Sequence, residues 1–355
     1  MDFTNKKTIA AYLTHKLGKP CEIVEIEKFG RGSSRETWFM TYKCGNGADE
    51  HVVFRRDPAA GATDTSPLSQ EYFIYEALGR SKVPVAKALW WEEDATWTTR
   101  PFYVRQHIEG SWNVEHFKDP SPAYDELRIR ISREHMRKLA LVHAVDWKAL
   151  GLDKVLTTAP SLEAAAPNYI DSLVATFDAI RIEGVPIILE SAEWLKARAP
   201  VASRIGLCKG TNGLGEEIFR GEDLVAMSDW EEAQIGDPAA DFAFMQDFAP
   251  TVVKNGETVW SLQHAIDYYK SVGGANVTVE AVQYYQLVRS LKMIIFSHRA
   301  AACVHASADA PIRQGWTGTE VQHLGKHVVA MAMGMMPPID PNYFIELNVS
   351  VENES

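Results

Sequence analysis

Hydrophobic residues follow two different spacings in this chain, and the change falls roughly a third of the way along it. Before residue 107, short segments rich in β-branched and aromatic residues alternate with turn residues, which is typical of strands. We predict strands over residues 21–26, 37–42, 51–56, 83–91 and 102–106. Helical spacing covers residues 4–17 and 69–78, with Thr4 as the predicted N-cap of the first helix. This order predicts an α+β lobe built on a small antiparallel sheet of five strands.

Beyond residue 122 the apolar positions recur at helical spacing. We predict helices over residues 126–144, 169–182, 191–197, 259–272, 279–305 and 320–335, with short strands at 217–219 and 224–228. The last twenty residues contain three prolines and no period, which predicts an extended tail. The expected organisation is an N-lobe of residues 1–106, a larger helical C-lobe of residues 107–335 and a tail of residues 336–355.

Length, composition and charge narrow the class of protein. A chain of 355 residues is long for one core, which agrees with two lobes. The net charge of −11 argues against a nucleic-acid partner, because such a surface needs clustered Lys and Arg. No segment has the length of apolar sequence that a membrane span or secretory leader requires. We therefore expect a small-molecule substrate, with homo-oligomer formation left open.

The spacing of the cysteines indicates their redox state and, from it, the cellular compartment of the protein. Cys21, Cys44, Cys208 and Cys303 are scattered, without the close pairs typical of zinc sites or a disulfide framework. The pattern predicts four reduced thiols in a cytoplasmic protein.

A glycine-rich segment separates the first two predicted strands. Gly30 and Gly32, followed by Ser33 and Ser34, would let backbone N–H groups approach a phosphate closely. Glycine-rich hairpins are common, however, and the segment lacks the third glycine of a full kinase loop. On its own it also suits an ordinary turn.

Two charged residues strengthen the phosphate interpretation. Arg55 lies on the third predicted strand, where protein kinases keep a lysine for the phosphates, and Glu71 lies in the helix that follows. The alternative for each residue alone is a surface arginine and a solvated helical glutamate.

The wider pattern resembles the aminoglycoside-phosphotransferase-like family. Within it, the chain resembles a broad bacterial branch, some of whose members are fused to or named after acyl-CoA dehydrogenases. The resemblance covers residues 21–335 and is carried by residues 32–38, 53–58, 83–85, 101–104, 109–110, 141–146, 229–231 and 236–238, with Glu71 and Asp241. It implies a two-lobed, protein-kinase-like fold with a cleft near residues 106–110. It also implies ATP and Mg²⁺ as cofactors, provided that phosphoryl transfer is retained.

The resemblance also implies roles for particular residues. It assigns the phosphate loop to residues 30–34, the phosphate-contacting cation to Arg55, the acid that orients this cation to Glu71, and the magnesium ligand to Asp229. Asp241 is expected to hold a loop of the C-lobe in shape.

The catalytic loop departs from the family pattern of His-Gly-Asp, four residues and Asn. Lys209 stands in place of the histidine, Thr211 in place of the base aspartate and Glu216 in place of the metal-binding asparagine. Losing such a base typically costs about 10²–10⁴-fold in rate. Glu216 can still offer oxygen to a metal beside Asp229, or it can pair with Lys209. If buried in the cleft, Lys209 would have a lowered pKa and serve as acid, base or amine nucleophile.

Three functions follow, and the sequence leaves them open. The first is an enzyme repurposed for non-phosphoryl acid–base or lyase chemistry on a small molecule, with Lys209, Glu216 and Asp229 as catalytic residues. Tryptophans near the cleft would favour an aromatic substrate. The second is an ATP- and Mg²⁺-dependent phosphotransferase with a relocated base, Glu216 or Glu231. The third is a non-catalytic, pseudokinase-like binding module.

Overall fold

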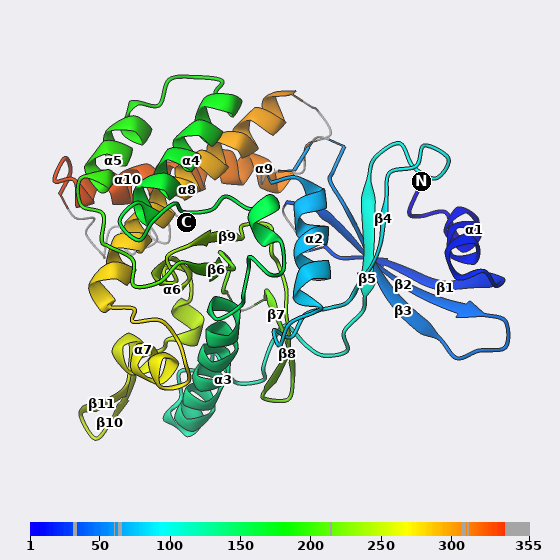
Figure 1. Ribbon diagram of the computed structural model, residues 1–355, viewed down its shortest axis with the longest axis horizontal. Helices are drawn as coiled ribbons and strands as arrows, with labels where there is room; N and C mark the ends of the chain where they lie inside the picture. The colour runs from blue at the N-terminus through cyan, green and yellow to red at the C-terminus, as the bar shows by residue number, and fades with distance from the viewer. Residues whose placement is uncertain are drawn as a thin grey trace, which may run out of the picture.

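The N-terminal lobe is an antiparallel sheet of five strands, which lies on the right of Figure 1, a view of the computed structural model of the protein. Its strands are β1 (Cys21–Lys28), β2 (Glu36–Cys44), β3 (Glu50–Arg56), β4 (Ala88–Glu92) and β5 (Phe102–Gln106), in the spatial order β1-β2-β3-β5-β4. The structure describes residues 1–30, 34–59, 61–62, 66–213, 215–306, 310 and 312–337. The predicted five-stranded sheet is confirmed.

Alternation along the strands gives the sheet two apolar faces with different partners. The outer face, with Met40, Phe54 and Val104, packs against Tyr12 and Leu13 of α1 (Lys6–Leu17). The predicted N-cap of α1 is wrong by one residue. Asn5 caps the helix, and its side chain accepts hydrogen bonds from the second and third residues that follow.

The inner face of the sheet is covered in part by α2 (Leu68–Leu78), which packs against β4 and β5. The predicted strand over residues 83–91 begins only at Ala88. Pro84 has no N–H for a strand ladder, and its carbonyl accepts a hydrogen bond from Met227 of the other lobe at 2.8 Å. This segment therefore joins the lobes instead of extending the sheet.

The C-terminal lobe is mainly helical and lies on the left of Figure 1. Its helices are α3 (Asp125–His143), α4 (Ala165–Ile180), α5 (Pro186–Lys196), α6 (Ala239–Phe242), α7 (Leu262–Ser271), α8 (Val279–Ala306), α9 (Ile312–Trp316) and α10 (Gln322–Ala332). The long helix α8 packs against α4, α5, α6 and α10 and forms the centre of this lobe. Within the described ranges, no helix is both long and apolar enough to cross a bilayer.

Three short strand pairs complete the C-lobe. They are β6 (Gly206–Cys208) with β9 (Gln234–Gly236), β7 (Glu217–Arg220) with β8 (Asp223–Met227), and β10 (Val252–Lys254) with β11 (Glu257–Trp260). The helix predicted over residues 259–272 is wrong at its start, because Trp260 pairs with Val252 and only then does α7 begin. Most of the predicted tail, residues 338–355, lies outside the described residues.

A disulfide joins β1 to β2 through Cys21 and Cys44. The two residues are paired directly across the strands, so their side chains point to the same side of the sheet. The prediction of four reduced thiols is therefore wrong for this pair, whereas Cys208 and Cys303 are free and buried. A cross-strand pair separated by 23 residues leaves no close Cys motif in the sequence.

Candidate nucleotide-binding cleft

A cavity of about 480 Å³ lies between the two lobes. It is lined by Phe29, Ser34, Arg35, Thr37, Phe39, Val53, Arg55, Arg105, His107, Ile108, Gly110, Trp112, Gly215, Glu216, Ile218, Ser228, Asp229, Glu231 and Arg313. This volume falls within the range of small-molecule and cofactor sites. The predicted cleft near residues 106–110 is therefore present.

Arg55 and Glu71 meet at the inner face of the sheet, as the sequence predicts. Arg55 Nε lies 3.2 Å from a carboxylate oxygen of Glu71, whose side chain is fully buried. Burial alone would raise the pKa of the Glu71 carboxyl, but the adjacent arginines, Arg55 foremost, lower it. The arginine is thus held in place by a permanently charged partner on α2.

Arg35 is a functional candidate that sequence reasoning missed. Its buried guanidinium lies 3.1 Å from Glu71, 2.9 Å from Asp57 and 3.5 Å from Glu231. Two arginines therefore share Glu71, one from β3 and one from the segment before β2. The sequence feature that could have revealed Arg35 is its position directly after the glycine-rich segment. Its role was not evident there, because its partners come from three other parts of the chain.

Two of the five residues in the predicted phosphate loop, Gly30 and Ser34, are described by the structure. Ser34 is buried, and its hydroxyl donates to the carboxylate of Glu231 at 2.7 Å. Gly30 is exposed. Gly32 and Ser33 lie outside the described residues. The bond between Ser34 and Glu231 attaches the end of this segment to the opposite lobe.

Asp229 and Glu216 line the same cavity from the C-lobe. Asp229 lies 3.7 Å from Arg55, and its Oδ1 is buried without a hydrogen-bond partner among the described residues. Its backbone has φ of +64°, which is uncommon for a non-glycine residue and which aspartate adopts more readily than most. Burial raises the pKa of Asp229, although Arg55 opposes the shift.

Glu216 is a carboxyl group of the cavity with a pKa near neutrality. Burial raises the pKa of Glu216 to about 7, against the opposing effect of Lys209. One of its oxygens accepts the N–H of Gly213, and its backbone carbonyl accepts the N–H of Ser228 at 3.1 Å. The group is therefore fixed in orientation and titrates where most enzymes work.

Lys209, a candidate catalytic residue if it lay in the cleft, is not among the residues that line this cavity. Its ammonium is fully buried, lies 3.2 Å from Glu217 and donates to the carbonyl oxygen of Thr211. Burial alone would lower the pKa of Lys209, but the carboxylates around it, Glu217 foremost, raise it. The lowered pKa expected for a lysine buried in the cleft therefore does not apply, and the alternative of an ion-paired lysine holds, with Glu217 as the partner in place of Glu216.

Thr211 is likewise unavailable as a substitute base. Its hydroxyl donates to the backbone carbonyl of Asp229 at 2.6 Å, and the residue is buried. Thr211 therefore links the loop at residues 209–216 to the segment that carries Asp229.

Asp241 holds the same loop from α6, as the sequence predicts. Its two carboxylate oxygens accept the N–H groups of Lys209 and Gly210, each at 2.7 Å. Gly210 has φ of +90°, and an added Cβ would lie 2.6 Å from the carbonyl oxygen of Glu232. Only glycine fits there, which explains why this position of the family motif is retained.

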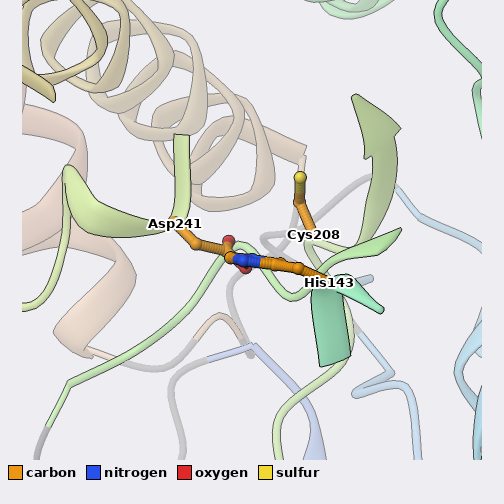
Figure 2. Close-up of side chains that lie close together, drawn as sticks. All are labelled: His143, Cys208 and Asp241. Carbon is orange, nitrogen blue, oxygen red and sulfur yellow. The ribbon is translucent and has the colours of Figure 1, made fainter. Parts of the chain in front are cut away.

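Cys208 joins Asp241 and His143 in a buried cluster whose ligand atoms lie within 4.8 Å of one another (Figure 2). His143 Nε2 contacts Asp241 at 2.9 Å, and its Nδ1 contacts the Tyr269 hydroxyl at 2.6 Å. The Cys208 thiol donates to the carbonyl of Asp237. The ring nitrogens of His143 and both carboxylate oxygens of Asp241 already have hydrogen-bond partners, so the cluster supports the loop.

The comparison with protein families agrees with this geometry. Residues 25–255 match the phosphotransferase enzyme family known as APH. This match covers more than half of the chain, so the protein belongs to that family, and its fold is the two-lobed, protein-kinase-like α+β fold predicted from the sequence.

Two mouse proteins are among the curated relatives. Acyl-CoA dehydrogenase family member 10 of Mus musculus is 28% identical over 236 residues, which cover 65% of this chain and 20% of that protein. Acyl-CoA dehydrogenase family member 11 of the same species is 24% identical over 249 residues, or 68% of this chain and 31% of that protein. The chain thus corresponds to a minor part of each relative.

Solved structures show the same fold across nearly the whole chain. A provisionally assigned aminoglycoside phosphotransferase from Ralstonia eutropha has a TM-score of 0.65 at 19% identity and covers 93% of this chain and 98% of its own. A GDP complex of aminoglycoside 2'-phosphotransferase-IIIa has a TM-score of 0.58 at 16% identity and covers 93% and 99%. At these identities the likeness concerns the fold.

Proposed function

We propose that the interlobe cavity binds a purine nucleotide with Mg²⁺ and that the protein transfers the terminal phosphoryl group to a hydroxyl of a small molecule. The observation that carries this proposal is that Arg55, held by the buried Glu71, lines one cavity together with Asp229. Proteins of this fold have been solved with ADP and hygromycin B and with GDP. A repurposed enzyme would have no need to keep a buried arginine–glutamate pair at the phosphate position.

Glu216 takes the proton in the proposed reaction. The acceptor hydroxyl loses its proton to the Glu216 carboxylate as its oxygen bonds to the terminal phosphorus. The bridging bond to the nucleoside diphosphate breaks in the same step, and Arg55 stabilises charge on the phosphate oxygens. A base with a pKa of about 7 has the protonation range that this role requires.

The residues of the cavity fit a magnesium ion. Asp229 offers a buried carboxylate oxygen without a hydrogen-bond partner among the described residues, and carboxylate oxygens suit Mg²⁺. Asp229 would hold the ion, which when bound neutralises charge on the phosphate oxygens. That Glu216 is a second metal ligand stays a prediction. It can be tested, because metal binding and proton transfer predict different pH behaviour for this carboxyl group.

Calorimetric titration with ATP and GTP, each with Mg²⁺, tests the proposal. We expect saturable binding that weakens roughly tenfold or more in Arg55→Gln, because a charged hydrogen bond to phosphate is lost. Arg56→Gln is the matched control, because Arg56 is the next residue of β3 and its side chain pairs with Glu36 outside the cavity. Screening small hydroxylated molecules for those that cause release of the nucleoside diphosphate then identifies the acceptor. If neither ATP nor GTP binds, the proposal is wrong.

A second candidate is acid–base or lyase chemistry without phosphoryl transfer. It is favoured by the missing base aspartate, by the near-neutral pKa of Glu216 and by the aromatic lining of Phe29, Phe39 and Trp112, which would suit an aromatic molecule. Turnover without bound nucleotide, lost in Glu216→Gln, would support it. Nucleotide binding without turnover of any acceptor would instead support a pseudokinase-like binding module.

A further inference from the structure

Arg105 is a cationic residue of the cavity that the proposed reaction does not use. It lies on β5 directly opposite Val53, and Tyr103 lies directly opposite Arg55. Side chains two residues apart point to the same face of a strand, so Arg105 shares the cavity face with Arg55. It is about 7 Å farther along the sheet, towards the connection between the lobes.

The guanidinium of Arg105 is buried without the partners that its neighbours have. The residue is only 7% exposed, yet no carboxylate within the described residues forms an ion pair with it. Its Nε is buried without a hydrogen-bond partner, and its clearest contact is the ring of Tyr75, 5.4 Å away. Arg55, in contrast, pairs with both Glu71 and Glu231. Glu71 is near enough for Arg105 to lower the pKa of its carboxyl, but no described carboxylate lies within ion-pair distance, so a ligand in the cavity is a natural source of an acceptor.

The position of Arg105 identifies the part of the ligand that it would meet. Arg55 and Asp229 mark the phosphate end of the proposed nucleotide site. The strand register places Arg105 nearer to the interlobe connection, whose residues His107 and Ile108 also line the cavity. A nucleotide whose phosphates reach Arg55 therefore presents its base to Arg105.

A guanidinium distinguishes the purines because it only donates hydrogen bonds. The O6 and N7 atoms of guanine are two adjacent acceptors that match the planar fork of an arginine. Adenine presents an amino group in place of O6, and this group is itself a donor. We infer that Arg105 reads the base and that the cavity prefers a 6-oxopurine nucleotide, of guanosine or inosine, over adenosine. This inference rests on the proposed function.

Calorimetry with GDP, IDP and ADP, each with Mg²⁺, tests the preference on the intact chain. We expect GDP to bind on the order of ten- to a hundredfold more tightly than ADP, the range of one bidentate base contact. IDP keeps O6 and N7 and should bind within a few-fold of GDP. The 7-deaza analogue of GDP lacks one acceptor and should lose part of the preference.

Two substitutions separate base reading from charge. Arg105→Met keeps the length of the side chain and removes its donors, so GDP affinity should fall to that of ADP. Arg105→Lys keeps the charge without the fork and should lose most of the preference as well. Arg100→Met, just before β5, is the matched control because Arg100 does not line the cavity. Unchanged melting temperatures confirm that the variants fold.

The outcomes distinguish this inference from the proposed function. Equal affinities for GDP and ADP in the native protein would overturn the role of Arg105 and leave the nucleotide site standing. A GDP preference that persists in Arg105→Met would assign base reading to another residue and would equally overturn the inference. If neither these diphosphates nor ATP and GTP bind, the proposed function fails and the inference fails with it.

Discussion

Among single residues, Glu216 has an ionisation that makes the clearest prediction for activity. Its pKa of about 7 means that the carboxylate forms as pH rises through neutrality. If Glu216 accepts the proton, turnover should rise with pH through about 7 and reach a plateau above it. A pH–rate profile measures this limb. Because bound metal would depress the pKa, a profile flat down to about pH 5 would indicate a metal ligand instead.

The same shift predicts a pH-dependent stability. The carboxyl is harder to ionise in the folded protein than in the unfolded chain, so stability falls as pH rises from about 4.5 to about 7. Glu216→Gln removes the cost of the buried charge and keeps an acceptor for Gly213. We expect its melting temperature to exceed that of the native protein at pH 8, with the difference vanishing near pH 4. A variant that is less stable at pH 8 would contradict the raised pKa.

Lys209 is expected to act on stability. Its ammonium and the Glu217 carboxylate are both fully buried, so Lys209→Met leaves an uncompensated buried charge. Such a loss costs about 3–5 kcal/mol, and Lys209→Met combined with Glu217→Gln should recover part of it. Urea denaturation of Lys209→Met, Glu217→Gln and the double variant measures both effects. A stable, folded Lys209→Met variant without activity would favour the catalytic role that the sequence suggests.

At the level of elements, the disulfide between β1 and β2 makes a prediction that the sequence did not. Closing a loop of this length contributes about 3 kcal/mol in the chain-entropy treatment. We expect a reductant to lower the melting temperature, and Cys21→Ser to match the reduced protein. Thiol titration of the unfolded, unreduced protein should find only Cys208 and Cys303. Detection of all four thiols would restore the expectation of a reduced protein.

The elements also show what local patterns can predict. The strands of the N-lobe and the long helices were found because their apolar faces are several residues long and regular. Strands β6 and β9 were missed because each has only three residues and gains its hydrogen bonds from a partner far along the chain. The start of α7 was misplaced because Trp260 is apolar at helical spacing while its backbone pairs with β10.

For the whole molecule, the sequence predicted correctly several of the residues that meet in the cleft. It predicted less well which ion pairs they form and in which direction their pKa values shift. The pairing of Arg55 with Glu71 followed from the family pattern, and so did the position of Asp229. The partner of Lys209 was wrong because Glu216 and Glu217 are adjacent, and successive residues entering a strand point in opposite directions. Arg35 and Arg105 were missed because their significance lies in partners present or absent in three dimensions.

Glu231 joins the two lobes and provides the last test of this arrangement. It accepts the Ser34 hydroxyl and lies 3.2 Å from Arg55 and 3.5 Å from Arg35, all on the N-lobe side. Glu231→Gln keeps the shape and removes the charge, so the two arginines lose one of their shared carboxylates. Removing one partner of a buried ionic network typically costs several kcal/mol. Because the loss falls between the lobes, calorimetry should resolve an earlier unfolding transition of the N-lobe.

Glu232→Gln is the matched control, since its partners Arg289 and Lys292 both belong to α8. It should destabilise the C-lobe without separating the transitions, and a single, unshifted transition in Glu231→Gln would show that other contacts hold the lobes together.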